Sequence, residues 1–189
     1  MNQALGSITI IRKHDLSSPC WLAERAGLTV NGLGVAELLQ GTLTAFFASR
    51  QCPGTAIRAA TAWALQQARD CSTVISGFHS PLEQSVLRLL VEARSPVIVV
   101  LGRPVAGSLL RSGWREALVA GKLAVVSDST GTQRLTEHSA QARNKLAARL
   151  ADHILIAHAS PDGQLALQCT HWLAECRDVR WIGDTQGHL

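Results

Sequence analysis

The sequence predicts a Rossmann-like α/β fold, a three-layer sandwich with a mostly parallel sheet. Two observations lead to this prediction. Short apolar runs alternate with longer segments of helical periodicity from residue 43 onward, and the run at residues 96–101, PVIVVL, is apolar at every position. Strands with no polar face are typical of a parallel sheet that helices cover on both sides. We therefore expect right-handed crossovers between neighbouring parallel strands.

The predicted elements follow one another with little interruption. Strands are expected at residues 43–48, 73–75, 96–101, 123–126, 154–157 and 179–182. Helices are expected at residues 55–69, 82–93, 109–119, 137–150 and 164–175. Thr55 can cap the first of these helices, because its hydroxyl can accept from the N–H groups of the first turn.

The first forty residues fit this alternation less well. Residues 8–11 are expected to form a short edge strand, and residues 18–26, SPCWLAERA, a short helix. We therefore expect residues 1–40 to be an N-terminal extension packed on the sheet. Residues 41–189 would form the nucleotide- or nucleic-acid-binding domain.

Composition narrows the class of protein. With 189 residues, the chain is long enough for one α/β domain, and 47% hydrophobic with 17% charged residues argues against extensive disorder. A net charge of +4 favours anionic partners. Five cysteines without a C-x-x-C pair or a signal sequence predict reduced thiols in a cytoplasmic protein. No apolar stretch reaches the ~18 residues that span a bilayer, so we expect no membrane contact.

Polar and basic residues gather where the predicted strands end. Ligands of doubly wound sheets bind beyond the carboxyl ends of the strands. Hydroxyls, glycines and arginines at these ends suit contacts to phosphates and sugars. The candidate binding residues are Ser49, Arg50, Ser76, Gly77, Phe78, His79, Ser80, Glu83, Gly102, Arg103, Arg143, Asn144, Lys145, Ser160 and Gly163.

Two of these ends are the most informative. Residues 72–83 read as a strand, a polar turn and a helix start at Pro81, a geometry that points backbone N–H groups at an anion. Arg50 follows another strand and precedes a helix N-terminus, so we expect it to face the same rim. The alternative is a surface arginine paired with a nearby acid. Phe78 is the one aromatic expected on the rim for base stacking.

Catalysis and metal binding find little support in the sequence. His79, Ser80 and Glu83 share one loop, but the G-x-S-x-G pattern of a nucleophile elbow is absent. We expect His79 to hydrogen-bond or stack, and Glu83 to lie in the first turn of a helix, where its charge is favourable. His153 and His158 have no neighbouring cysteine or carboxylate cluster, so no metal is expected. The G-x-G-x-x-G fingerprint is also absent, and no cofactor is expected.

Four stretches resemble the Rossmann-like domain of the DNA-processing protein A (Smf) family, in a superfamily that also holds the Lonely-guy nucleotide hydrolases. They are LTAFFASRQCPG, VISGFHSPLEQSVLRLL, PVIVVLGRP and ARNKLAARLADHILIAHASPDGQLAL, and the likeness runs from about residue 28 to 182. The positions that match are Ser49, Arg50, Ser76, Gly77, Gly102, Arg143 and Asn144. Glu83 stands where the family usually has an aspartate.

The resemblance implies a homodimer that binds single-stranded DNA on this rim without catalysis. The sequence departs from the family at Ala48 and Lys145, which replace a glycine and an arginine. SPDGQLALQ lacks the glycine pair and the glutamate of the hydrolase branch. Two alternatives stay open. One is a sensor or hydrolase for a small nucleotide or nucleotide sugar, with Glu83 as its general acid or base. The other is a partner-binding protein with a vestigial pocket.

Overall fold

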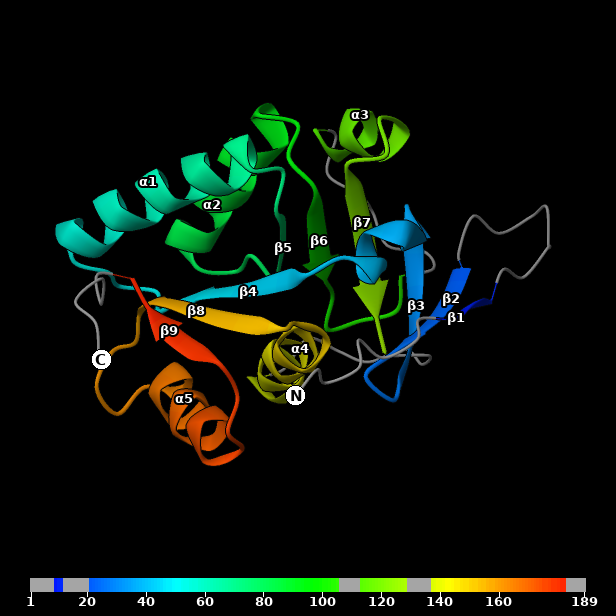
Figure 1. Cartoon of the computed structure of the whole chain (residues 1–189). Helices are drawn as coiled ribbons and strands as arrows, with labels where there is room; N and C mark the ends of the chain where they lie inside the picture. The colour runs from blue at the N-terminus through cyan, green and yellow to red at the C-terminus, as the bar shows by residue number, and fades with distance from the viewer. Residues whose placement is uncertain (1–8, 12–20, 106–112, 129–136, 183–189) are drawn as a thin grey trace, which may run out of the picture.

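One twisted sheet lies between two layers of helices in the computed structural model, which describes residues 9–11, 21–105, 113–128 and 137–182 (Figure 1). The strands in these ranges form a nine-stranded sheet in the order β1-β2-β3-β7-β6-β5-β4-β8-β9. Their bounds are β1 Thr9–Ile11, β2 Trp21–Arg25, β3 Leu28–Gly34, β4 Leu43–Ala48, β5 Thr73–Ser76, β6 Val97–Val100, β7 Leu123–Ser127, β8 His153–His158 and β9 Val179–Trp181. The helices are α1 Gly54–Arg69, α2 Pro81–Glu92, α3 Trp114–Val119, α4 Glu137–Leu150 and α5 Gln164–Ala174, with a 3-10 helix η1 at Ala36–Gln40.

The six strands from β4 onward pair in parallel, and helices cover both of their faces. Helices α1, α2 and α3 pack on one face, and α4 and α5 on the other (Figure 1). Every residue of β6 and β7 is buried, as a strand covered on both sides requires. The predicted three-layer fold with a mostly parallel sheet is confirmed.

Strand β4 lies at the centre of this core and sends neighbouring side chains to opposite faces. The ring of Phe46 stacks on Trp63 of α1, with ring centroids 5.1 Å apart. The ring of Phe47 stacks on Trp172 of α5, with centroids 5.0 Å apart. One strand therefore joins both helical layers.

The order of the strands reverses beside β4. The chain moves outward from β4 through β5 and β6 to β7, and α4 then leads back to β8 on the other side of β4. In a doubly wound sheet, the helices on the two sides of such a point diverge and leave a crevice at the carboxyl ends of the strands. The fold thus places its natural ligand position at the ends of β4 and β8.

The predicted elements from residue 43 onward are confirmed, with β4 and α4 at the predicted bounds. The cap predicted at Thr55 is wrong, because α1 begins at Gly54, its N-cap residue is Pro53, and no side chain caps it. The edge strand predicted near residue 10 is confirmed as β1, and residue 8 lies outside the described residues. The predicted helix at 109–119 is described only from residue 113, and α3 begins at Trp114.

The short helix predicted at residues 18–26 is wrong, because Trp21–Arg25 form strand β2; residues 18–20 lie outside the described ranges. Trp21, Ala23 and Arg25 are buried on one side of the strand, a period of two that the helix-forming composition of LAER conceals. Strand β2 pairs with β3, which in turn pairs antiparallel with β7 and extends the sheet. The division of the chain at residue 40 stays a prediction.

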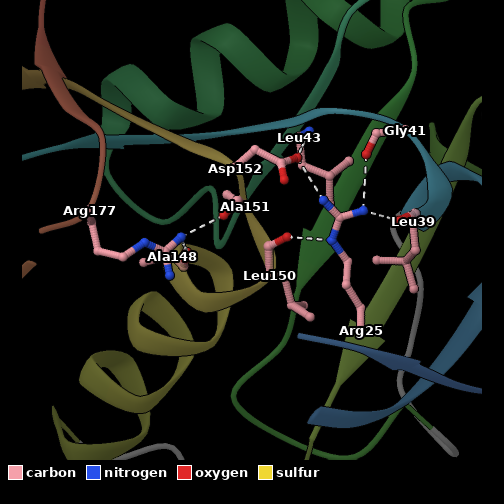
Figure 2. A network of polar contacts seen from close by, with 9 residues as sticks. All are labelled: Arg25, Leu39, Gly41, Leu43, Ala148, Leu150, Ala151, Asp152 and Arg177. Atoms are coloured by element: carbon pink, nitrogen blue, oxygen red, sulfur yellow. Dashed lines mark hydrogen bonds and ion pairs between the residues drawn. The ribbon is translucent and has the colours of Figure 1, made fainter. Parts of the chain in front are cut away.

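A buried arginine fastens this antiparallel edge to the rest of the fold (Figure 2). Arg25 of β2 donates to the main-chain oxygens of Leu39, Gly41 and Leu150. Its Nη2 atom also lies 2.7 Å from Oδ2 of Asp152. Arg25 therefore connects β2, the end of η1 and the end of α4.

A second arginine acts on the same helix end (Figure 2). Arg177 donates to the main-chain oxygens of Ala148 at 2.7 Å and Ala151 at 2.6 Å. The last carbonyls of a helix have no partner within it, and cations there also suit the helix dipole. The two arginines fix the C-terminal end of α4, whose earlier turns carry Arg143 and Asn144 toward the ends of β4 and β8.

Candidate nucleic-acid interface

A hollow of about 540 Å³ lies at the carboxyl ends of β4, β5 and β8, next to the reversal of strand order. We call it the strand-end pocket. Its walls come from the turn after β4, the turn between β5 and α2, helix α4 and the start of α5. The predicted site residues that line it are Ser49, Arg50, His79, Ser80, Glu83, Arg143, Asn144, Ser160 and Gly163.

The turn after β4 is held against the turn after β8. The backbone N–H of Ser49 donates to the carbonyl oxygen of His158 at 2.9 Å, and the Ser49 hydroxyl accepts from the backbone N–H of Ser160 at 2.9 Å. Arg50, next in the chain, is exposed, and its side chain forms no ion pair or hydrogen bond within the described ranges. The alternative of a paired surface arginine therefore finds no partner in the described part of the chain.

The turn between β5 and α2 is organised by Glu83. Ser80 and Glu83 form a capping box, in which the Ser80 hydroxyl accepts from the Glu83 N–H at 3.2 Å and Glu83 Oε2 accepts from the Ser80 N–H at 3.1 Å. Oε2 also accepts from the His79 N–H at 2.6 Å, and Oε1 accepts from the Ala48 N–H at 3.0 Å. One carboxylate thus ties the end of β4 to the start of α2.

Glu83 is only 5% exposed, and this burial has the largest effect on its pKa. Burial raises the pKa of Glu83, because the charged form loses its hydration, while the three backbone N–H donors and the charge of Arg143 act in the opposite direction. Both carboxylate oxygens are already used by backbone donors. The capping box could be read from the S-x-x-E spacing, but the bond to Ala48 could not, because it joins segments 35 residues apart in sequence.

Arg143 lines the pocket from α4 and lies close to Gly77. It is 5% exposed, and its Nε atom has no hydrogen-bond partner in the described part of the chain. A Cβ atom placed on Gly77 would lie 2.0 Å from Nε of Arg143, so only a glycine leaves room for this guanidinium. Burial lowers the pKa of Arg143, and the nearby charge of Glu83 opposes that effect. Gly77 therefore leaves the space that the Arg143 side chain fills, a role that the sequence did not predict.

Helices α4 and α5 meet at the pocket through carboxamide side chains, which sequence reasoning missed apart from Asn144. Gln141 Nε2 donates to Gln164 Oε1 at 2.6 Å, and Asn144 Nδ2 donates to Gln168 Oε1 at 3.1 Å. Gln168 Nε2 in turn donates to the main-chain oxygen of Gln141 at 3.2 Å. Such residues gave no local signal, because the pairs lie more than twenty positions apart in the sequence.

The first turn of α5 opens on the same pocket. Gly163 is the N-cap residue and supplies no side-chain cap, so the N–H groups that follow have no side-chain acceptor there. Gly163, Gln164 and Leu165 all line the pocket. A helix N-terminus of this kind favours an anion, because its N–H groups and its dipole both attract negative charge.

The remaining predicted site residues lie outside the pocket lining. Ser76 is buried and its hydroxyl accepts from the Phe78 N–H at 3.2 Å. Phe78 is 3% exposed and packs in the core on the α1 and α2 side, so the expected rim-exposed ring is not found. Gly102 and Arg103 follow β6. Lys145 is exposed on α4, two positions beyond the buried Arg143. Two positions along a helix rotate the side-chain direction by roughly 200°, so the two residues lie on opposite sides of α4 and differ in exposure.

The described ranges hold no cluster of three or more His, Cys, Asp or Glu side chains that could bind a metal ion. Within the same ranges, no helix has both the length and the apolar character that crossing a membrane requires. The expectation of a site without metal or cofactor stays a prediction.

Comparison with solved structures identifies proteins of the same fold. DNA processing protein A from Helicobacter pylori, whose structure was described for its mode of binding single-stranded DNA, superposes with a TM-score of 0.67 at 14% identity, over 81% of this chain and 71% of that one. DNA processing protein A from Streptococcus pneumoniae gives 0.65 at 19% identity, over 81% and 54%. The molybdenum cofactor carrier protein of Chlamydomonas reinhardtii gives 0.52 at 13% identity, over 75% and 76%.

These likenesses establish the fold, and this chain spans about half the length of the Streptococcus pneumoniae protein. A search of curated proteins found no match. The model of the family described as DNA recombination-mediator protein A matches residues 12–183, which is most of the sequence. The chain therefore belongs to the DNA recombination-mediator protein A family.

Proposed function

We propose that this protein binds single-stranded DNA through the strand-end pocket and the basic rim around it, without catalysing a reaction. The observation that carries the proposal is the exposed Arg50, which has no partner among the described residues and lines the same pocket as the open first turn of α5 and the buried Arg143. Membership of the DNA recombination-mediator protein A family supports it, as does the fold shared with a Helicobacter pylori protein that binds single-stranded DNA.

The proposed roles of the basic residues follow from their exposure. Arg50 contacts a phosphate directly, because its guanidinium can donate two parallel hydrogen bonds to phosphate oxygens. Arg143 is buried and adds positive potential at the pocket without needing to touch the ligand. Arg103 and Lys145 extend the binding surface beyond the pocket and neutralise phosphates farther along the strand.

The carboxamide side chains would add contacts to groups other than phosphate. An amide side chain offers both a donor and an acceptor, so it can pair with sugar hydroxyls or with the edge of an unpaired base. Gln141, Asn144, Gln164 and Gln168 surround one side of the pocket. Together they would hold the sugar-base part of a nucleotide whose phosphate lies at Arg50.

A small nucleotide is the second candidate ligand, because a pocket of about 540 Å³ falls within the size range of small-molecule sites. Hydrolysis of that ligand is disfavoured by the bonding of Glu83. Both of its carboxylate oxygens accept backbone N–H groups, so neither is placed to exchange a proton with a ligand.

We also propose a homodimer in the cytoplasm. Ile57 and Leu65 are large apolar side chains exposed on α1, and a second copy packed against α1 would cover them. The described cysteines, Cys52, Cys71, Cys169 and Cys176, are free thiols, which suits a reducing compartment. Light scattering after gel filtration tests the dimer, and a monomer mass at high micromolar concentration would contradict it.

Fluorescence anisotropy with a labelled single-stranded oligonucleotide, measured at several salt concentrations, tests the proposed function. We expect saturable binding that weakens steeply with salt, because phosphate contacts release counterions. A thermal-shift panel of nucleotides tests the second candidate, since a ligand that binds only the folded protein raises its melting temperature. Absence of DNA binding at low salt together with a shift by one nucleotide would replace the first proposal by the second.

A further inference from the structure

A second cavity, which we call the α2–α3 cavity, lies between helices α2 and α3. Its volume is about 650 Å³, and it shares no lining residue with the strand-end pocket. Part of its wall is apolar and comes from α2, from α3 and from the residue that follows α3. The residues of this part are Leu87, Val91, Trp114, Ala117 and Ala120.

One end of the α2–α3 cavity is polar. Arg94, Ser95 and Lys122 line it and lie just before β6 and β7, where the Val97 N–H donates to the Lys122 carbonyl oxygen at 2.9 Å and holds the two segments side by side. Ser95 is 2% exposed, and its hydroxyl oxygen has no hydrogen-bond partner in the part of the chain that is described. A buried hydroxyl without a partner is uncommon, since the lost hydration is not replaced. Its hydrogen-bonding capacity is therefore unused within the described residues.

The charged residues around the cavity leave an excess of basic groups. Arg88, Arg94 and Lys122 line it, and none of these side chains forms an ion pair or hydrogen bond within the described residues. Glu92 and Glu116 also line it. Arg94 and Lys122 stand at the same end as the unpaired Ser95 hydroxyl. Positive charge and a hydrogen-bonding group are thus placed together, at the end of an apolar wall.

We propose that the α2–α3 cavity binds a small amphipathic anion, an organic acid with an apolar body. The apolar body lies between Leu87 of α2 and Trp114 of α3, and the acidic group lies at Arg94, Ser95 and Lys122. Cavities of this size with apolar walls and a few converging polar groups are typical ligand sites. The proposal does not depend on DNA binding, because the two sites have separate lining residues.

Two fluorescent probes that differ in charge test this proposal. The anionic probe is 1-anilinonaphthalene-8-sulfonate, and the neutral probe is N-phenyl-1-naphthylamine, which has the same ring system without the sulfonate. We expect the anionic probe to saturate at one site per folded chain and to bind more weakly as salt increases. Failure of the anionic probe to bind the folded protein saturably would overturn the proposal.

Substitution of Arg94 and Lys122 tests whether the cavity recognises the charge of the probe or only its apolar rings. The double variant Arg94→Asn/Lys122→Gln should weaken the anionic probe about tenfold and change the neutral probe less than about twofold. Asparagine is chosen at position 94 because Arg94 has a φ of 54°, which asparagine tolerates. The control is Arg69→Asn/Arg149→Gln, which removes the same charge from exposed positions outside the cavity. An equal loss in both double variants would contradict a specific anion site.

A cavity-filling variant locates the probe by another route. Ala117→Phe places a ring in the half-buried wall of the cavity and should abolish binding of both probes while the protein stays folded by circular dichroism. Single-stranded DNA binding should stay unchanged in this variant. Probe binding that survives Ala117→Phe in the folded protein would place the probe elsewhere and overturn the assignment.

Discussion

The guanidinium of Arg143 occupies the space that a side chain at Gly77 would need. A Cβ atom at residue 77 would lie 2.0 Å from Arg143 Nε and 2.6 Å from its Cδ. The pair joins the turn after β5 to helix α4 at the strand-end pocket. The position of the buried charge thus depends on the absence of a side chain on the neighbouring turn.

Gly77→Ala should displace Arg143, because the added methyl group would clash with Cδ and Nε of this buried side chain and not with its mobile end. We expect a loss of about 1–3 kcal/mol in the free energy of unfolding, and weaker binding of single-stranded DNA. Urea denaturation and anisotropy measure the two effects. The matched control is Gly41→Ala, whose added Cβ meets no atom within 4 Å. Equal stability of the two variants would show that Arg143 can move aside without cost.

Glu83→Ala should be strongly destabilising, since it leaves the N–H groups of Ala48, His79 and Ser80 without their acceptor. With about 1 kcal/mol for each bond, the expected loss is about 3 kcal/mol. Glu92→Ala removes an exposed acid from the same helix and should change stability by less than about 0.5 kcal/mol. A loss for Glu83→Ala no greater than that for Glu92→Ala, in chemical denaturation, would contradict the organising role of this carboxylate.

The sequence predicted the parallel part of the fold well, because its signals are local. The run LTAFFA is apolar and bounded by polar residues, and the observed strand β4 has the predicted bounds. The prediction for the N-terminal part was wrong, because contacts distant in sequence decide the structure there. The segment WLAER is rich in helix-forming residues, but pairing with β3 decides its structure, and Trp21 packs where only a glycine at position 32 leaves room.

The candidate site was predicted less completely than the fold. The strand ends indicated where the pocket lies, and Ser49, Arg50 and Asn144 do line it. Burial could not be read from residue type, so Arg143 and Phe78 were expected on the rim although both are buried. The carboxamide contacts between α4 and α5 depend on how two helices pack, which no local pattern encodes.

Arg25→Met tests the connection between the antiparallel edge and α4. The substitution keeps an apolar stem but removes the Arg25 donor from the three main-chain oxygens and from Asp152, which keeps the N–H of Leu43 as a donor. We expect a loss of about 3 kcal/mol in the free energy of unfolding, because the buried partners lose their compensation. Arg69→Met, at an exposed position of α1, is the control. Denaturation curves that coincide for the two variants would contradict this role of Arg25.

The carboxylate of Asp178 gives a pH-dependent prediction. Hydrogen bonds from the exposed Arg180 hold the pKa of Asp178 below its ordinary value of 3.8, and His153, whose Nδ1 lies 2.5 Å from Oδ2, acts in the same direction. Because the folded-state pKa is lowered, the stabilisation is present above pH 3.8 and lost as the pH falls through the folded-state value.

Asp178→Asn should therefore reduce stability at pH 7 by less than about 1 kcal/mol, since the groups are partly exposed. Urea denaturation of wild type and variant at pH 7 and at pH 2.5 measures the difference. We expect the difference to be smaller at the lower pH. A difference that is the same at both pH values would show that the charge of Asp178 does not contribute.

The most direct test of the central claim is the salt dependence of single-stranded DNA binding by wild type, Arg50→Ala and Arg69→Ala, measured by fluorescence anisotropy. Both arginines are exposed, but only Arg50 lines the strand-end pocket. We predict that Arg50→Ala weakens binding about tenfold and reduces the slope of log affinity against log salt by about 1, whereas Arg69→Ala matches wild type. Equal affinities and slopes for the two variants would contradict DNA binding at this pocket.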